Sequence, residues 1–354
     1  MEIKKQLLLS FVIPTYNFSN FIAATVESIE NGAKMLKLSQ FEVVILDGGS
    51  NDNTDNVVCP LIDLYKNIRY IKQAKRGGID GDMDTAAGIA AGKYIWLFSA
   101  DDVLECGWDK HLVPLLARGG DVFLVPATLC DIRMTPLRQN PIFKNCIIGE
   151  PVNFNIFPGD ASLHNYLNQA ATLEALFSYI SSIVVNADIW RGLPVRKDYF
   201  GSNWAHCARL MPLFFRKTKI TYLNKFLIKK RSGNDSFMEN GFVARVLIAI
   251  EGWNKIIKEF FVDASDQQVL YNRLRKDIQV LLFYSKISAQ QASEIERLNT
   301  MAGLLYSGCN PSTSARISYF IYRLIPRNII LNSIIRPFLP VMIRLRHKIK
   351  AVFV

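Results

Sequence analysis

The sequence has few residues suited to holding a structural metal, and it has no long hydrophobic run. Its six cysteines form no Cys-x-x-Cys pair and its four histidines form no His-Glu-x-x-His motif, so we expect no structural zinc site. Scattered cysteines of this kind are typical of reduced thiols in the cytoplasm. No segment approaches the roughly 20 uninterrupted apolar residues of a membrane-spanning helix. We therefore predict a cytoplasmic chain without a transmembrane helix.

Acidic residues are missing from the end of the chain. No Asp or Glu occurs from Arg297 to Val354, whereas nine of the 42 Lys and Arg residues lie there. The other 33 basic residues nearly balance the 31 acidic ones, so the net charge of +11 belongs almost wholly to this tail. A nucleic-acid-binding protein would be expected to spread basic residues over its folded surface. The distribution therefore argues against a nucleic-acid partner.

The first 130 residues alternate short apolar runs with segments of helical spacing. We predict strands at 7–13, 41–46, 68–71 and 94–98, and helices at 21–38 and 83–91. Strands joined by helices form a parallel sheet with right-handed crossovers, so the predicted fold class is α/β. Later in the chain we predict strands at 123–125, 180–185 and 220–228, followed by two or three helices within 242–305.

Aspartates cluster at or after the ends of the predicted strands. They are Asp47, Asp52, Asp80, Asp82, Asp84, Asp101 and Asp102. Ligands of open α/β sheets bind outside the carboxyl ends of the strands. Carboxylates that converge there repel one another unless a hard divalent cation such as Mg²⁺ lies among them. Two simpler interpretations stay open: Asp101 and Asp102 could cap a helix near 108–116, and 47–50 could be an ordinary turn.

Three segments at these strand ends resemble the family-2 glycosyltransferases, which have the GT-A fold. They are SFVIPTYN at 10–17, DGGSNDNT at 47–54, and GIAAGKYI at 88–95 leading into SADD at 99–102. The resemblance implies a Rossmann-like, mostly parallel sheet flanked by helices, with a helical C-terminal region. It also implies that a nucleotide-sugar donor binds near the strand ends. The residues assigned to this donor are Pro14, Thr15, Tyr16, Asn17, Asp47, Gly49, Ser50, Asp80, Asp82, Ala100 and Arg231.

The same resemblance implies a divalent cation, Mg²⁺ or Mn²⁺, on the donor diphosphate. In the family it binds an Asp-x-Asp element, whose matching carboxylate here is Asp101, whereas Ser99 stands where the first Asp usually is. Metal binding would then rest on Asp101, with Asp102 beside it. A cation and a basic side chain stabilise the leaving group when a glycosyl–phosphate bond breaks. The candidates for the basic side chain are Arg231, Lys229 and Lys230. A solvated strand end is the alternative for each of the three.

A narrower resemblance, to the O-antigen abequosyltransferase group, covers residues 7–260. It rests on SYISSIVV at 178–185, YFGS at 199–202 with His206, and RSGNDSF at 231–237. Enzymes of this group transfer a dideoxyhexose from a CDP-sugar to a lipid-linked oligosaccharide. The resemblance implies a metal-dependent hexosyltransferase that adds one sugar, with CDP-abequose as a favoured donor. Its acceptor would be an undecaprenyl-diphosphate-linked oligosaccharide of bacterial O-antigen or lipopolysaccharide biosynthesis.

Two other functions stay open. One is a transferase of the same fold that uses a UDP-hexose on a different acceptor. The other is a catalytically inactive protein that binds sugar nucleotides or acts as a scaffold, because Ser99 replaces an Asp and an acidic pair usual after the acceptor segment is missing. In an active enzyme the acceptor hydroxyl needs a base within hydrogen-bond reach. His206 is our first candidate, with simple packing near Leu210 as its alternative, and Asp198 is the second.

The chain is predicted to have three parts: a catalytic domain at 1–240, a helical region at 241–310 and a tail at 311–354. The tail interleaves apolar and basic residues. It is divided into helices too short to span a bilayer by Pro326, Pro337 and Pro340. Basic amphipathic segments lie in the membrane interface. We therefore expect peripheral attachment to the anionic inner face of the cytoplasmic membrane, with a helical lid over the core as the alternative.

Overall fold

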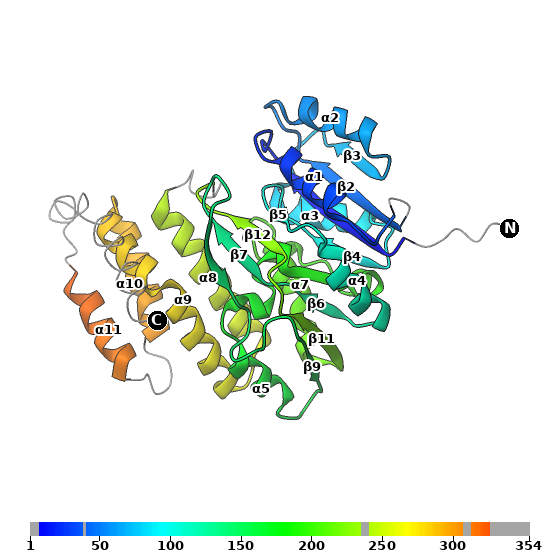
Figure 1. Cartoon of the computed structure of the whole chain (residues 1–354). Coiled ribbons are helices and arrows are strands. Elements are labelled where there is room, and N and C mark those ends of the chain that lie inside the picture. Colours follow the sequence, from blue (N-terminus) through cyan, green and yellow to red (C-terminus); the bar gives the residue numbers. More distant parts are fainter. Residues whose placement is uncertain (1–6, 38–39, 235–240, 307–312, 326–354) are drawn as a thin grey trace. The chain divides into compact units, whose positions relative to one another are not determined.

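Figure 1 shows the computed structural model of the chain, which describes residues 7–37, 40–234, 241–306 and 313–325. The chain divides into two units, Met1–Asn234 and Asp235–Val354. The predicted domain boundaries at residues 240 and 310 stay predictions.

An eight-stranded sheet forms the centre of the first unit, in the order β3-β2-β1-β4-β10-β6-β11-β9. The strands are β1 (Leu9–Thr15), β2 (Phe41–Asp47), β3 (Ile68–Lys72), β4 (Tyr94–Leu97), β6 (Val122–Leu124), β9 (Pro151–Ile156), β10 (Ile183–Asn186) and β11 (Thr218–Leu223). Strands β1 to β4 run parallel, and β10 is antiparallel to both of its neighbours. The predicted α/β class is therefore confirmed.

Helices join or follow the strands. In the first unit they are α1 (Ile22–Gly32), α2 (Thr54–Leu64), α3 (Gly78–Ile89), α4 (Trp108–Arg118), α5 (Ser162–Gln169), α6 (Ala187–Gly192) and α7 (Ala205–Leu210). The helix predicted at 21–38 ends earlier, at Gly32, where a Cβ would lie 3.0 Å from the Trp108 ring. After this close approach the chain turns, and the Asp109 carboxylate accepts the backbone N–H of Lys34 at 2.7 Å.

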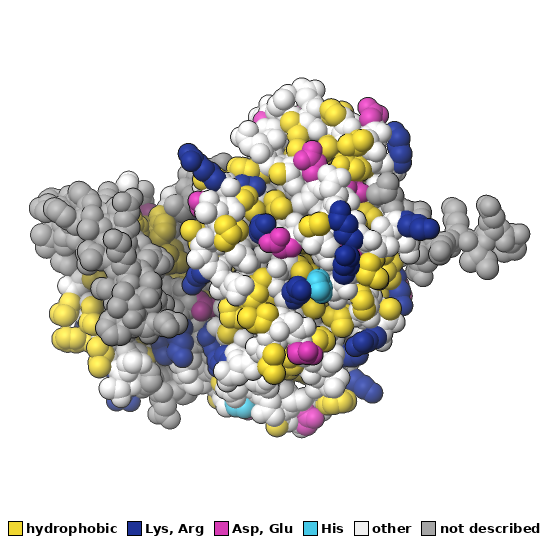
Figure 2. Space-filling model, viewed as in Figure 1, with side chains coloured by type: hydrophobic (Ala, Val, Ile, Leu, Met, Phe, Trp, Pro, Cys, Tyr) yellow, Lys and Arg dark blue, Asp and Glu magenta, His cyan; other side chains and the backbone are white. Residues whose placement is uncertain are grey.

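Aromatic side chains pack β1, β4 and α4 against one another. Phe11 of β1 stacks on Trp96 of β4 with ring centroids 5.0 Å apart, and Trp108 of α4 meets Phe11 edge to face at 5.1 Å. Strands β1 and β2 are buried along their whole length, which explains their nearly continuous apolar sequences. On the face in view, Figure 2 shows Lys and Arg side chains scattered among apolar and acidic ones.

A second sheet of four strands has the order β5-β12-β7-β8. Its strands are β5 (Val103–Leu104), β7 (Ala127–Cys130), β8 (Pro136–Asn140) and β12 (Ile228–Arg231). The single strand predicted at 220–228 was wrong, because β11 ends at Leu223 and the chain changes sheets before β12. A tight turn at Asn224 and Lys225 separates them: the Lys225 N–H donates to the Leu223 carbonyl, and Asn224 accepts the Tyr222 hydroxyl.

Four helices are described in the second unit: α8 (Phe242–Phe260), α9 (Ala264–Ser288), α10 (Ala292–Tyr306) and α11 (Thr313–Leu324). The first three confirm the helices predicted within 242–305. Helix α11 buries Ala315 and Tyr322, and the Tyr322 carbonyl accepts a hydrogen bond from Lys286 Nζ of α9 at 2.9 Å. Within the described ranges, no helix combines the length and the apolar character needed to cross a membrane.

Candidate active site

The ends of β1 and β2 meet, as predicted for the nucleotide site. Thr15 and Asp47 are register partners, and the loops that follow them are joined when Asn17 N–H donates to Ser50 Oγ at 2.9 Å. Asp47 is fully buried and accepts the Ser50 N–H and the Tyr70 hydroxyl, each at 2.6 Å. The segments 14–17 and 47–50 therefore lie side by side at the carboxyl edge of the sheet.

Asp82 lies beside these loops. It is 3% exposed and accepts hydrogen bonds from Gln73 Nε2 at 2.9 Å and from the Gly77 N–H at 3.1 Å. A Cβ at Gly48 would lie 2.7 Å from its other oxygen, so a larger residue there would displace the Asp82 carboxylate. Burial raises the pKa of Asp82, while the hydrogen bonds and the charge of Arg76 oppose the rise.

Arg76 is a candidate functional residue that sequence reasoning missed. Its guanidinium lies 3.9 Å from the centre of the Tyr16 ring, so a cation is stacked at the end of β1. The available signal was the basic, glycine-rich run at 75–78, directly after β3.

Asp80, predicted to bind the donor, has another set of partners. Its carboxylate is 5% exposed and accepts three backbone N–H groups, those of Gly201, Asn203 and Ala205, at 2.8, 2.9 and 3.1 Å. Burial raises the pKa of Asp80, and these hydrogen bonds oppose the rise. Asp80 thus holds the loop that leads into α7, and its assignment to the nucleotide-sugar stays a prediction.

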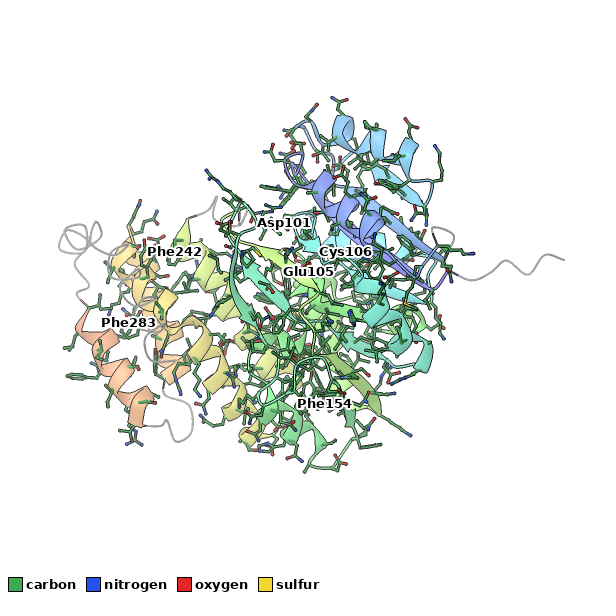
Figure 3. The ribbon with its side chains drawn as sticks, in the orientation of Figure 1. Asp101, Glu105, Cys106, Phe154, Phe242 and Phe283 are labelled. Atoms are coloured by element: carbon green, nitrogen blue, oxygen red, sulfur yellow. The ribbon has the colours of Figure 1, made fainter. Side chains whose placement is uncertain are left out.

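Asp101 and Asp102 lie beyond the end of β4, and Figure 3 labels Asp101 at this point. Neither caps α4, because its N-cap is Gly107; the helix-cap interpretation is wrong. Ala100, also predicted to bind the donor, is 3% exposed. Asp101 is half-buried, and its carboxylate accepts hydrogen bonds from the Ser99 hydroxyl and the Asn234 amide.

Asp102 is enclosed by protein donors. It is 2% exposed and accepts the hydroxyls of Tyr179 at 2.5 Å and Ser181 at 2.6 Å, together with the Arg231 N–H at 3.1 Å. Burial, reinforced by the negative charge of Asp101, raises the pKa of Asp102 to about 7. The two adjacent carboxylates therefore differ: Asp101 is partly accessible, and Asp102 links three segments of the chain.

Of the three basic candidates, Arg231 lies against Asp101. Its Nε donates to the Asp101 carbonyl at 2.9 Å, its Nη1 donates to the Ile132 carbonyl at 2.5 Å, and its guanidinium lies 4.7 Å from the centre of the Phe21 ring. The other two form ion pairs. Lys229 pairs with Glu105 at 3.1 Å, and Lys230 pairs with Glu174 at 3.3 Å. Within the described residues Arg231 has no carboxylate partner for its charge, which suits it best to an anion.

The two candidates for the base are both engaged by the protein. His206 of α7 is 9% exposed, with Nε2 3.4 Å from Cys207 Sγ. Burial, opposed by a hydrogen bond with the Phe177 backbone, lowers the pKa of His206 to about 4, so the ring is neutral at pH 7. The Asp198 carboxylate accepts two hydrogen bonds from Arg196, at 2.9 and 2.7 Å.

The carboxylate of Asp101 is the candidate ligand for a cation at this point of the structure. The described ranges contain no group of three or more His, Cys, Asp or Glu residues that could hold a metal ion by themselves. Mg²⁺, however, usually takes one or two carboxylates and completes its shell with water and substrate phosphates. One half-buried carboxylate with the hydroxyl of Ser99 and the amide of Asn234 around it fits a cation of this kind.

Part of the chain matches a known protein family. Residues 10–164 match the sequence profile of glycosyl transferase family 2. An abequosyltransferase of Salmonella typhimurium is 26% identical over 261 residues, which cover 72% of this chain and 76% of the relative. A chondroitin synthase of Escherichia coli is 35% identical over 103 residues, but these cover 29% of this chain and 14% of that protein.

Solved structures match over nearly the whole chain. The Staphylococcus aureus protein TarS (residues 1–349), crystallised with UDP, has a TM-score of 0.61 at 14% identity, and the match covers 94% of this chain and 91% of that one. The corresponding complex with UDP-GlcNAc has a TM-score of 0.60. At this identity the likeness concerns the fold, and it confirms the predicted GT-A class.

Proposed function

We propose that this chain, whose residues 10–164 match the profile of glycosyl transferase family 2, transfers a single sugar from a nucleotide-sugar to a lipid-linked oligosaccharide. The reaction would belong to bacterial O-antigen or related surface-polysaccharide biosynthesis. A CDP-dideoxyhexose such as CDP-abequose is the favoured donor, because the similarity to an abequosyltransferase extends over 72% of the chain. There are two alternatives: a transferase that uses a UDP-hexose donor, and an inactive scaffold protein.

The observation that carries the proposal is that Arg231, which donates from Nε to the Asp101 carbonyl at 2.9 Å, lies beside the half-buried Asp101 carboxylate after the end of β4, the strand next to β1. The loops at 14–17 and 47–50 are joined by the hydrogen bond between Asn17 and Ser50. In the proposed complex these loops bind the nucleoside, and the diphosphate lies near Asp101 and Arg231. The guanidinium offsets negative charge on the departing diphosphate, where stabilisation of developing charge lowers the barrier most.

Asp101 is the residue proposed to hold Mg²⁺ or Mn²⁺, with Asp102 beside it in a supporting role. The cation, when bound, supplies further charge stabilisation to the leaving diphosphate. For the acceptor hydroxyl, His206 remains the first candidate base, because burial keeps it in the neutral form that can take a proton. That same burial weakens its basicity, so Asp198 remains the second candidate.

Calorimetry with CDP and UDP, each with and without Mn²⁺, tests this function, followed by turnover of the corresponding nucleotide-sugars. We expect one nucleotide to bind and its binding to tighten with Mn²⁺. An inactive scaffold would show no metal-linked binding and no transfer. If neither nucleotide binds under either condition, the proposal is wrong.

We also propose that the chain attaches peripherally to an anionic membrane, where a lipid-linked acceptor is presented. Helix α11 supports this, because four apolar residues form one exposed stripe at helical spacing. They are Ile317, Phe320, Ile321 and Leu324, with exposed fractions of 55, 63, 49 and 64%. Two arginines and no acidic residue lie on the same helix, and each basic residue near such a surface contributes about 1 kcal/mol. The rest of the predicted tail, with Pro326, Pro337 and Pro340, lies outside the described residues.

A further inference from the structure

Two uncharged side chains hold the Asp101 carboxylate from both sides. The Ser99 hydroxyl donates to Oδ1, and the Asn234 amide donates to Oδ2. The neighbouring carboxylate, Asp102, has its own three donors and is almost fully buried. Asp101 is therefore a single, half-buried carboxylate whose two oxygens are both oriented by neutral partners.

Both partners are themselves fixed by the fold. The Ser99 N–H donates to Ser181 Oγ at 3.0 Å, and the same Ser181 hydroxyl donates to Asp102 at 2.6 Å. On the other side, Ser232 is bound twice to the Cys130 carbonyl, through its N–H at 3.1 Å and its hydroxyl at 2.6 Å. The segment that leads from Arg231 to Asn234 is thus tied to β7, and Asn234 approaches Asp101 from a supported position.

We propose that Ser99 and Asn234 are positioning residues that hold Asp101 for a divalent cation, and that their lack of charge makes cation binding depend on the donor diphosphate. This inference rests on the proposed function. A single carboxylate supplies one negative charge, which is too little to retain a cation that normally takes part of its shell from substrate phosphates. A second carboxylate at either position would hold the cation alone, but would repel the diphosphate whenever the cation was absent.

With neutral side chains at Ser99 and Asn234, binding of the cation and binding of the diphosphate therefore depend on each other. If the diphosphate increases affinity for the cation, the cation must increase affinity for the diphosphate by the same factor. Residues that orient a metal ligand typically change metal affinity by about 10- to 100-fold when they are removed. The coupling can be measured without turnover.

The experiment is Mn²⁺ titration of the full chain by calorimetry, alone and in the presence of saturating CDP or UDP. For the wild type we expect weak Mn²⁺ binding alone and binding about tenfold tighter with the nucleotide that the protein accepts. Asn234→Ala should lose about tenfold in Mn²⁺ affinity in the nucleotide complex, as should Ser99→Ala. Asn165→Ala, which removes an exposed amide on α5, is the matched control and should behave as wild type.

The charged variants give the opposite pattern. Asn234→Asp and Ser99→Asp should each bind Mn²⁺ about tenfold more tightly without nucleotide, and should bind nucleotide more weakly when Mn²⁺ is absent. Melting temperatures confirm that each variant is folded. Unchanged Mn²⁺ affinity in all four variants would overturn the inference. If nucleotide binds to the wild type and Mn²⁺ does not change its affinity, the inference and the proposed cation site are both wrong. If no nucleotide binds at all, the proposed function itself has failed.

Discussion

Asp102 could be a metal ligand or a residue that supports the fold, and the two roles predict opposite effects when its side chain is removed. Its carboxylate joins three segments by accepting the hydroxyls of Tyr179 and Ser181 and the N–H of Arg231. If these bonds are its role, Asp102→Ala should destabilise the first unit, because three buried donors lose their acceptor. If Asp102 instead binds the cation, the substitution should reduce Mn²⁺ affinity and leave stability nearly unchanged.

The expected loss of stability on substitution of Asp102 follows from its buried hydrogen bonds. An unsatisfied buried donor costs about 1–3 kcal/mol, and three donors share this acceptor, so we expect a loss of about 3 kcal/mol or more for Asp102→Ala at low pH. The loss should be smaller at high pH, where burial of the ionised carboxylate destabilises the wild type. Asp102→Asn keeps the shape, and its amide oxygen can still accept the Arg231 N–H. The two hydroxyls can rotate to accept from the amide nitrogen. We therefore expect Asp102→Asn to cost about 1 kcal/mol at low pH.

The pH dependence of Asp102→Asn provides a second, independent test. Burial and the charge of Asp101 raise the pKa of Asp102 from 3.8 to about 7. Between these values the folded state binds more protons than the unfolded state, so the wild type loses stability as the pH rises. The penalty reaches on the order of 4 kcal/mol above pH 7, at about 1.4 kcal/mol for each unit. Asn has no such penalty, so the stability of the variant relative to the wild type should increase as the pH rises.

Urea unfolding of wild type, Asp102→Asn and Asp102→Ala at pH 5 and pH 8, followed by circular dichroism, measures both effects. Wild-type stability of Asp102→Ala at pH 5, together with lost Mn²⁺ binding, would refute the supporting role. A free-energy difference between Asp102→Asn and wild type that is the same at both pH values would refute the raised pKa.

Three further predictions concern the site and α11. Asp101→Asn should lower turnover by a factor of about 10²–10³ without changing the melting temperature, measured as initial rates at saturating donor. If His206 is the base, His206→Ala should lose kcat and keep donor affinity, and because its pKa is lowered to about 4, wild-type activity should persist below pH 6.5. Phe320→Ser combined with Leu324→Ser should reduce co-sedimentation with anionic vesicles, and high salt should weaken the binding of wild type.

Each of the three has a contrary outcome. Near wild-type turnover of Asp101→Asn would remove Asp101 from the donor site. Loss of donor binding or of stability in His206→Ala would identify a packing residue and bring Asp198 forward. Wild-type protein that ignores anionic vesicles at low salt would favour the alternative in which the tail is part of the fold.

Strands β1 and β2 were predictable because they are buried on both faces. A strand of this kind must be apolar along its whole length, so β1 and β2 stand out against their polar ends. The ends of the strands were predictable for the opposite reason: a polar run such as DGGSNDNT cannot continue inside a buried sheet. Sequence alone therefore predicted where the buried strands end and which polar loops follow them.

The partners of each carboxylate were not predictable in the same way. Asp80, Asp82, Asp101 and Asp102 look alike in the sequence, but Asp80 accepts N–H groups from a loop about 120 residues away. Which carboxylates face a ligand and which satisfy buried donors depends on how distant segments pack. Arg76 was missed for a related reason, since its contact with Tyr16 is made across two loops.

The basic residue beside Asp101 is selected by strand register. Strand β12 runs antiparallel to β5, with Ile228 opposite Leu104 and Lys229 opposite Val103. Continued in the same register, this pairing brings Arg231 opposite Asp101, in agreement with the hydrogen bond from Arg231 Nε to the Asp101 carbonyl. Side chains alternate along a strand, so a slip of one residue would exchange the two faces. The turn at 224–225, which a pattern of apolar residues does not reveal, moves the chain into the second sheet where this register is set.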